Sequence, residues 1–208
     1  MITVTNTSNS SLGTAQSFTG AIEFFRANYG LSGLAQLPAR QQQAARQALL
    51  TGLMTAEGDF QASSPATRLD VARAVMLGAG ARMPQYLPYS PTYVDLPDNA
   101  NALFIESVAH SPQGDLMPLT GSEFNPQGQA DRLTVAVAMA KALGLSADCQ
   151  TNPGLTDWST IPSWARGYVN AAISRGLMTA TSGYFRPFDP ITRLELSMAA
   201  VALQQAAR

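Results

Sequence analysis

Three arginines occupy the same place in a short pattern that occurs three times in this chain of 208 residues. Arg68, Arg132 and Arg193 each precede a leucine, and each follows a phenylalanine by eight residues. The guanidinium is a planar fork of N–H donors that pairs with carboxylates. Its partner is either an anionic ligand or a carboxylate of the protein, such as Asp95, Asp157 or a neighbour. The repetition predicts three similar surfaces rather than one catalytic pocket.

Residues that carry out catalysis are scarce in this chain. His110 is the only histidine and Cys149 the only cysteine, and they lie far apart in the sequence. A Ser–His–Asp triad or a metal site would have to be built on these isolated residues. The few carboxylates form no distinctive pair of the kind that a glycosidase needs. We therefore predict that this chain is not an enzyme and that it uses no cofactor or metal.

The composition argues against nucleic acid as a partner and against insertion into a membrane. Apolar residues make up 46% of the chain, which is enough for a core, and charged residues only 13%. A net charge of −1 gives little attraction to a phosphate backbone, so nucleic acid is not an expected partner. No apolar run approaches the roughly 18 to 20 residues of a membrane-spanning helix, and the N-terminus has no signal-peptide pattern. We interpret residues 1–14 as a linker or the tail of a preceding domain, with an ordinary terminal tail as the alternative.

Each arginine opens a predicted helix. Thr67 and Thr192 read as N-caps with an acid three residues later, which is the capping-box pattern. Asp131 is the N-cap of the middle copy, where that acid is missing. Gly144 marks one helix end, and Gly78 or Gly80 another. The predicted helices cover residues 68–78, 132–143 and 193–205, and they are apolar on nearly every side, which is typical of buried helices.

An earlier helix precedes each of these three. The first and third begin near a proline and run to about Thr51 and Arg175, and the middle one covers 99–110. A further helix is expected at about 15–28. The loops between the paired helices are rich in Gly and Ser, and we expect one phenylalanine to pin each loop to the core. These phenylalanines are Phe60, Phe124 and Phe185.

The third copy carries five motifs in order over about forty residues. The motifs are Leu155-Thr156-Asp157, Trp164-Ala165, Gly176-Leu177, Phe185-Arg186-Pro187 and Ile191-Thr192-Arg193-Leu194-Glu195. This copy resembles the S-layer homology module, and the two other copies keep parts of the same pattern, so the chain resembles a triple module of this family. Such modules are found at the ends of exported bacterial envelope proteins and secreted proteases.

The resemblance implies an all-α fold. Three tandem helix-loop-helix repeats would form a pseudo-three-fold trident around a central three-helix bundle. We expect the repeats at 15–80, 81–145 and 146–208. The first of these is degenerate and carries the extra N-terminal helix.

The resemblance also implies a ligand and its contacts. The family binds cell-wall polysaccharide, often through an acidic pyruvate ketal, in grooves between modules, and the motif arginine is its main anion contact. That role falls on Arg68, Arg132 and Arg193. Asp95 and Asp157 are further candidates but read equally as turn-formers, and Trp164 either stacks on a sugar or belongs to the core. The remaining candidate contacts are the loop residues Gly121, Ser122, Ser182 and Gly183.

We therefore predict a non-catalytic module that anchors a larger exported protein to the cell envelope by binding an acidic envelope polysaccharide. We expect an extracellular location, no insertion into the membrane and a monomeric isolated module. The alternative is a structural or interaction module of a larger secreted enzyme, such as a subtilisin-like protease, with sugar binding lost.

Overall fold

The computed structural model describes residues 31–56, 59–84, 86–97, 100–119 and 121–208. Within these residues the protein is all-α, as predicted, with no strand and with two short 3-10 helices, Leu31–Leu34 and Trp158–Thr160. The tail at 1–14 and the helix expected at 15–28 lie outside the described residues. The α-helices are α2 (Ala39–Leu50), α3 (Arg68–Gly78), α4 (Asn101–Ala109), α5 (Arg132–Ala142), α6 (Ser163–Ser174) and α7 (Arg193–Ala206).

The starts of α3, α5 and α7 are fixed by their own side chains. Thr67 and Thr192 cap α3 and α7, and each forms a complete capping box with the acid three residues later. Asp131 caps α5 by accepting a hydrogen bond from the N–H of Thr134 over 2.7 Å. All three predicted starts are confirmed, because capping depends only on residues within one turn.

Glycine ends several helices. Gly80 and Gly144 follow α3 and α5 with φ of +66° and +65°, a left-handed conformation that glycine adopts without a steric penalty. Gly78 lies inside α3, so Gly80 rather than Gly78 is the stop in the first copy. The predicted ends of α3, α5 and α7 differ from the observed ends by at most one residue.

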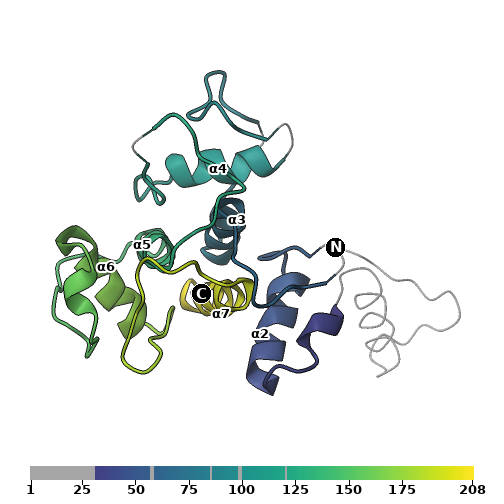
Figure 1. Ribbon diagram of the computed structural model, residues 1–208. Helices are drawn as coiled ribbons and strands as arrows, with labels where there is room; N and C mark the ends of the chain where they lie inside the picture. Colours follow the sequence, from purple (N-terminus) through teal and green to yellow (C-terminus); the bar gives the residue numbers. More distant parts are fainter. Residues whose placement is uncertain (1–30, 57–58, 85, 98–99, 120) are drawn as a thin grey trace, which may run out of the picture.

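Helix α3 lies at the centre and packs against both α5 and α7. Figure 1 shows these three helices in the middle and α2, α4 and α6 around them. The helix pairings fit a bundle, and small residues let the helices approach closely. A side chain at Gly78, for example, would come within 3.0 Å of the Leu203 side chain of α7. The buried residues of α5 include Val135, Ala136, Val137, Ala138, Met139 and Ala140.

Each outer helix packs mainly on an inner helix from another copy of the pattern. Helix α4 packs on α3 and α6 packs on α5, so each outer helix covers the inner helix that precedes it in the chain. Helix α2 packs on α7 and thereby joins the first copy to the third. The stable helix pairs therefore differ from the helix-loop-helix units read along the sequence, because the loops carry the chain from one pair to the next.

Three buried backbone segments at the centre form hydrogen bonds with one another in a closed cycle. The N–H of Ala66 donates to the carbonyl oxygen of Ile191 over 2.8 Å, and the N–H of Ile191 donates to that of Ala130 over 2.9 Å. The N–H of Ala130 then donates to the carbonyl oxygen of Ala66 over 3.0 Å, which closes the cycle. Buried backbone groups need such partners. The three copies are therefore mutually dependent, since each segment takes its partners from the two others.

Candidate functional site

Each motif arginine reaches from its helix to the loop of another copy. The Nε–H donates to the backbone carbonyl of that loop's buried phenylalanine, and the guanidinium lies over the ring of the same phenylalanine at 4.8 to 5.3 Å from its centroid. This arrangement combines a hydrogen bond with a cation–π contact. The pairs are Arg68 with Phe124 (2.7 Å), Arg132 with Phe185 (2.7 Å) and Arg193 with Phe60 (2.9 Å).

Two of the arginines also pair with the capping acid of that other copy. Nη1 of Arg132 lies 2.8 Å from Oε1 of Glu195, and Nη1 of Arg193 lies 3.3 Å from Oδ2 of Asp70. The corresponding position for Arg68 is Thr134, which has no carboxylate. Nη2 of Arg68 is buried without a hydrogen-bond partner. In the two other copies the acid pairs with Nη1, while Nη2 donates to the carbonyl oxygen of Thr55 or Thr179. Arg68 therefore lacks both the acid and the backbone acceptor among the described residues.

Arg132 is closed to ligands by its surroundings. Its side chain is 3% exposed, and its Nη2 donates to the carbonyl oxygen of Thr179 over 2.6 Å. Burial lowers the pKa of this guanidinium, and the neighbouring Glu195 carboxylate opposes that shift. Burial likewise lowers the pKa of Arg68. Both groups hold the copies together, Arg132 at a buried position and Arg68 at a partly exposed one.

Asp95 and Asp157 shape the loops that receive the arginines. Each carboxylate accepts two consecutive backbone N–H groups, from a phenylalanine and from the residue after it, over 2.7 to 2.9 Å. That second residue is Asn125 or Arg186, and both have left-handed φ values, of 55° and 57°. The carboxylates thus stabilise a strained turn. They form no ion pair with a motif arginine among the described residues, so the internal partners are Asp70 and Glu195 instead.

A polar groove of about 440 Å³ opens beside Arg193. Arg193 comes from the third copy, Asp70 and Arg73 from the first, and Asn101 and Gln127 from the second. The groove therefore exists only when all three copies are assembled. Its carboxylates, amides and guanidinium groups can hydrogen-bond the hydroxyl groups of a sugar. The groove is also lined by Thr55, Asp59, Gln61, Thr67 and Leu69.

The other predicted contacts lie apart from this groove. Trp164 is 58% exposed in the first turn of α6, so its assignment to the core is wrong, and it remains a candidate for stacking on a sugar. The loop with Gly121 and Ser122 leads to the phenylalanine that Arg68 contacts, and the loop with Ser182 and Gly183 leads to the one that Arg132 contacts.

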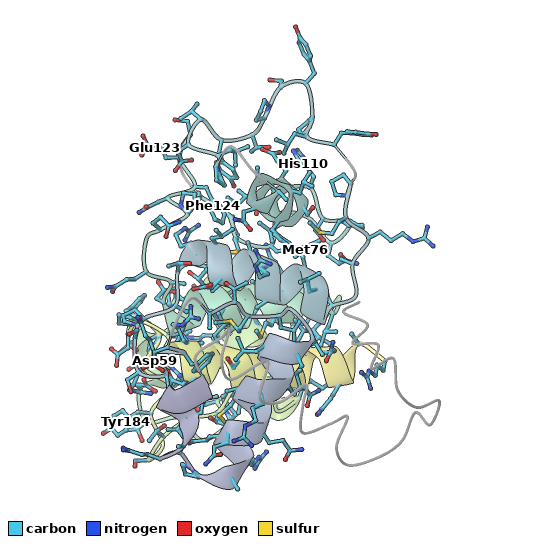
Figure 2. All side chains as sticks on the ribbon, turned by 90° about the vertical axis from the view of Figure 1, so that its right-hand side faces the viewer. Asp59, Met76, His110, Glu123, Phe124 and Tyr184 are labelled. Atoms are coloured by element: carbon cyan, nitrogen blue, oxygen red, sulfur yellow. The ribbon has the colours of Figure 1, made fainter. Side chains whose placement is uncertain are left out.

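These loops gather on one side of the molecule. Figure 2 shows Asp59, Glu123 and Tyr184, which immediately precede the three pinned phenylalanines, along the same edge of the view. Phe60, Phe124 and Phe185 themselves are fully buried, which confirms their predicted role.

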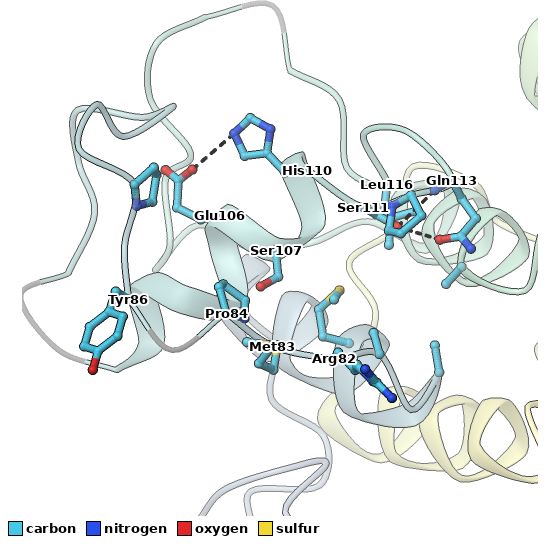
Figure 3. A pocket seen from close by; sticks show the side chains of 16 residues that line it. Arg82, Met83, Pro84, Tyr86, Glu106, Ser107, His110, Ser111, Gln113 and Leu116 are labelled. Carbon is cyan, nitrogen blue, oxygen red and sulfur yellow. Dashed lines mark hydrogen bonds and ion pairs between the residues drawn. The ribbon is translucent and has the colours of Figure 1, made fainter.

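His110 stands beside a larger, mostly apolar cavity of about 790 Å³ (Figure 3). Its Nε2 lies 2.8 Å from Oγ1 of Thr92 and 3.5 Å from Oε2 of the buried Glu106. The Oγ of Ser107 donates to a backbone carbonyl and that of Ser111 to Gln113, so neither serine bonds to the histidine. The cluster therefore lacks the serine–histidine contact of a hydrolytic triad.

Within the described residues, no group of three or more His, Cys, Asp or Glu side chains could hold a metal ion. In the same part of the chain, no helix is long and apolar enough to cross a membrane.

Of the residues that line the groove, only Arg193 was predicted as a contact from the sequence. Arg73 is the one charged residue in the otherwise apolar part of α3 after Asp70, a signal that could have identified it. The capping-box pattern favours a structural role for Asp70, and its carboxylate both caps α3 and pairs with Arg193. Nothing local in the sequence points to that second role, because the two residues are joined only by the assembly of the first and third copies.

Comparison with known proteins identifies the third copy. Residues 154–197 match the S-layer homology domain, so this part of the chain is an S-layer homology domain. The domain is a non-catalytic binding module, and its presence implies anchoring at the cell envelope through a cell-wall polymer. Comparison with curated proteins gives no match to this chain.

Proposed function

We propose that this chain anchors a larger exported protein to the cell envelope by binding an acidic wall polysaccharide in the groove beside Arg193. The observation that carries the proposal is the S-layer homology domain at 154–197, whose motif arginine lines a polar groove shared by all three copies. The groove volume falls within the usual range for ligand sites, about 300 to 1,000 Å³. Its lining offers donors and acceptors for hydroxyls as well as positive charge for an acidic substituent.

The proposed architecture has three repeats, at 15–80, 81–145 and 146–208, arranged as a trident about an approximate three-fold axis. The cyclic hydrogen bonds of Ala66, Ala130 and Ile191 support it, since each copy uses the same position in the same way. The three arginine–phenylalanine contacts support it for the same reason. In this arrangement one module, as a monomer, brings the three loop regions together on one side.

Co-sedimentation with envelope polysaccharide from the cells that make the protein tests the function. We expect the unaltered chain to bind and Arg193→Ala to weaken binding about ten-fold or more, because a charge and the groove wall that it holds are lost. Arg193→Lys should not restore full binding, since an ammonium group cannot replace the planar fork. Arg40→Ala removes an equal charge outside the groove and serves as the control. Unchanged binding by a folded Arg193→Ala variant would contradict this role of the groove.

The second candidate is a structural module of a larger secreted enzyme without sugar binding. It is favoured by one observation, that the motif arginines donate to protein acceptors and that Arg132 is buried. It predicts that the unaltered chain does not sediment with the polysaccharide. It also predicts that Arg193→Ala lowers only the melting temperature. The same experiment therefore decides between the two functions.

A further inference from the structure

We propose that Arg73, rather than the motif arginine beside it, makes the direct contact with an anionic group of the polysaccharide. The proposal rests on the function proposed above and names the residue that recognises the charge of the ligand. It is based on how charges and hydrogen-bond donors are distributed in the groove of about 440 Å³.

Three of the five N–H donors of Arg193 are already used within the protein. Its Nε donates to the carbonyl oxygen of Phe60, and its Nη2 donates to that of Thr55. Its Nη1 pairs with Oδ2 of Asp70 at 3.3 Å. Only one N–H on each of Nη1 and Nη2 is left for a ligand. Arg193 thus serves mainly to hold the wall of the groove in place.

Arg73 has donors to spare. Its Nη2 donates to Oδ1 of Asn101, while its Nε and Nη1 make no hydrogen bond within the described residues. Neither of these two nitrogens is among the buried atoms that lack a partner. A ligand in the groove can therefore reach donors that the protein has left unused. Arg73 therefore keeps four of its five N–H donors, and an anion with two oxygens can bind along one edge of the planar fork.

Arg73 has no carboxylate partner of its own within the described residues. Asp70 is the carboxylate that acts on Arg73, but its Oδ2 already pairs with Arg193. The groove holds two arginines and two carboxylates, Asp59 and Asp70, and neither carboxylate forms an ion pair with Arg73 within the described residues. Burial lowers the pKa of Arg73, as expected for a cation partly removed from water. A half-buried cation of this kind is stabilised by an incoming negative charge.

Arg73 is also held in a fixed orientation. Its guanidinium lies over the ring of Phe104 in α4, with the central carbon 4.6 Å from the ring centroid, and Asn101 of the same helix accepts its hydrogen bond. A group that is ordered before the ligand arrives loses less entropy on binding. The arrangement fits a carboxylate or a phosphate on a sugar chain, since arginine binds both through the same fork. Gln127 and Asp59, which line the same groove, are placed for neighbouring hydroxyls.

Co-sedimentation of the full chain with three forms of the purified envelope polysaccharide tests the proposal. The forms are the native polymer, a polymer whose carboxylates have been converted to amides, and a polymer whose phosphates have been removed with cold hydrofluoric acid. The variants are Arg73→Gln, Arg73→Lys and, as a matched control outside the groove, Arg40→Gln. Each variant is first checked for its melting temperature, because Arg73 also joins α3 to α4.

We expect Arg73→Gln to bind the native polymer at least ten-fold more weakly than the unaltered chain, with Arg73→Lys in between. One neutralised polymer should bind the unaltered chain and Arg73→Gln equally, and which treatment achieves this identifies the anion as carboxylate or phosphate. Arg40→Gln should bind as the unaltered chain does.

Three results would overturn the proposal. Arg73→Gln could bind the native polymer as well as the unaltered chain does. It could bind native and neutralised polymers with the same loss, which would make Arg73 a structural link between α3 and α4. Neutralising the polymer could also leave its binding to the unaltered chain unchanged. If the unaltered chain binds none of the three polymers, the proposed function itself fails, a result that is distinct from a failure of Arg73 alone.

Discussion

Arg68 differs from its two counterparts in its contacts. Arg132 and Arg193 each pair with the acid of a capping box, whereas the corresponding position for Arg68 is Thr134, and Arg68 keeps a buried Nη2 without a partner. A buried donor that lacks an acceptor costs about 1 to 3 kcal/mol. The middle copy carries its acid at the N-cap instead, as Asp131, which acts on Arg68 only through its charge.

Rebuilding the missing capping box should stabilise the fold. The double change Asp131→Thr with Thr134→Glu reproduces the pattern of α7 and offers a carboxylate to Arg68. We expect the free energy of unfolding to rise by about 1 to 2 kcal/mol, through one new charge-assisted hydrogen bond. The melting temperature should rise by about 2 to 8 °C, which thermal denaturation followed by circular dichroism can measure.

Two controls show whether Arg68 is the cause. Asp131→Thr alone supplies no carboxylate to Arg68 and should give no increase in stability. The double change in an Arg68→Met background should also give none, because the partner of the new carboxylate has been removed. An equal gain in the presence and absence of Arg68 would attribute the effect to helix capping alone.

At the scale of the helices, local features were predictable and contacts between copies were not. The starts of α3, α5 and α7 follow from Thr67, Asp131 and Thr192, since a cap and its helix lie within a few residues. The pairing of α2 with α7 has no local signal, because it depends on contacts across most of the chain. The groove was missed for the same reason, as its lining residues come from three separate parts of the sequence.

Gly167 fixes how closely the segment at Ala147, at the start of the third copy, approaches α6. A Cβ added at this position would lie 1.8 Å from the carbonyl oxygen of Ala147, a contact with backbone that cannot turn away. Gly167→Ala should therefore lower the free energy of unfolding by about 1 to 3 kcal/mol through overpacking. Replacing glycine by alanine within a helix ordinarily raises the free energy of unfolding by about 1 kcal/mol. A decrease in Gly167→Ala would therefore show that the close contact outweighs this gain.

Gly78→Ala is the matched comparison for this prediction. Its added Cβ would meet the end of the Leu203 side chain at 3.0 Å, and a side chain can shift where a backbone carbonyl cannot. We expect a smaller loss, measured by urea denaturation alongside Gly167→Ala. If Gly167→Ala proved more stable than the unaltered chain, the close approach of residue 147 to α6 would be wrong.

At the scale of the whole molecule, the copies behave as one unit. Helix α2 is covered by α7, and the backbone cycle of Ala66, Ala130 and Ile191 links all three copies. No copy therefore completes its own core. This distinguishes the protein from an open solenoid, in which each repeat contacts only its neighbours in sequence and unfolding can begin at either end.

Weakening α2 should therefore destabilise the distant third copy. Leu49 is buried in α2, and Leu49→Ala should cost about 2 to 5 kcal/mol. Because the tryptophans Trp158 and Trp164 both lie in the third copy, their fluorescence should shift together with the circular dichroism of the whole chain in one transition. Leu50→Ala, at a neighbouring position that is 64% exposed, should change stability by about 0.5 kcal/mol or less. A tryptophan transition that did not move in Leu49→Ala would contradict this coupling.

The pairing of α2 with α7 also sets the order of events during synthesis. The ribosome makes α2 first among the described α-helices and α7 last. The face of α2 that packs on α7 therefore has no partner helix while the intervening residues are made. At about 5 to 20 residues per second this interval lasts roughly ten seconds or more. The nascent chain cannot lock into its final form until α7 has emerged. For a module whose domain implies a place in the cell envelope, we expect this delay to keep the polypeptide incompletely folded until its synthesis is nearly finished.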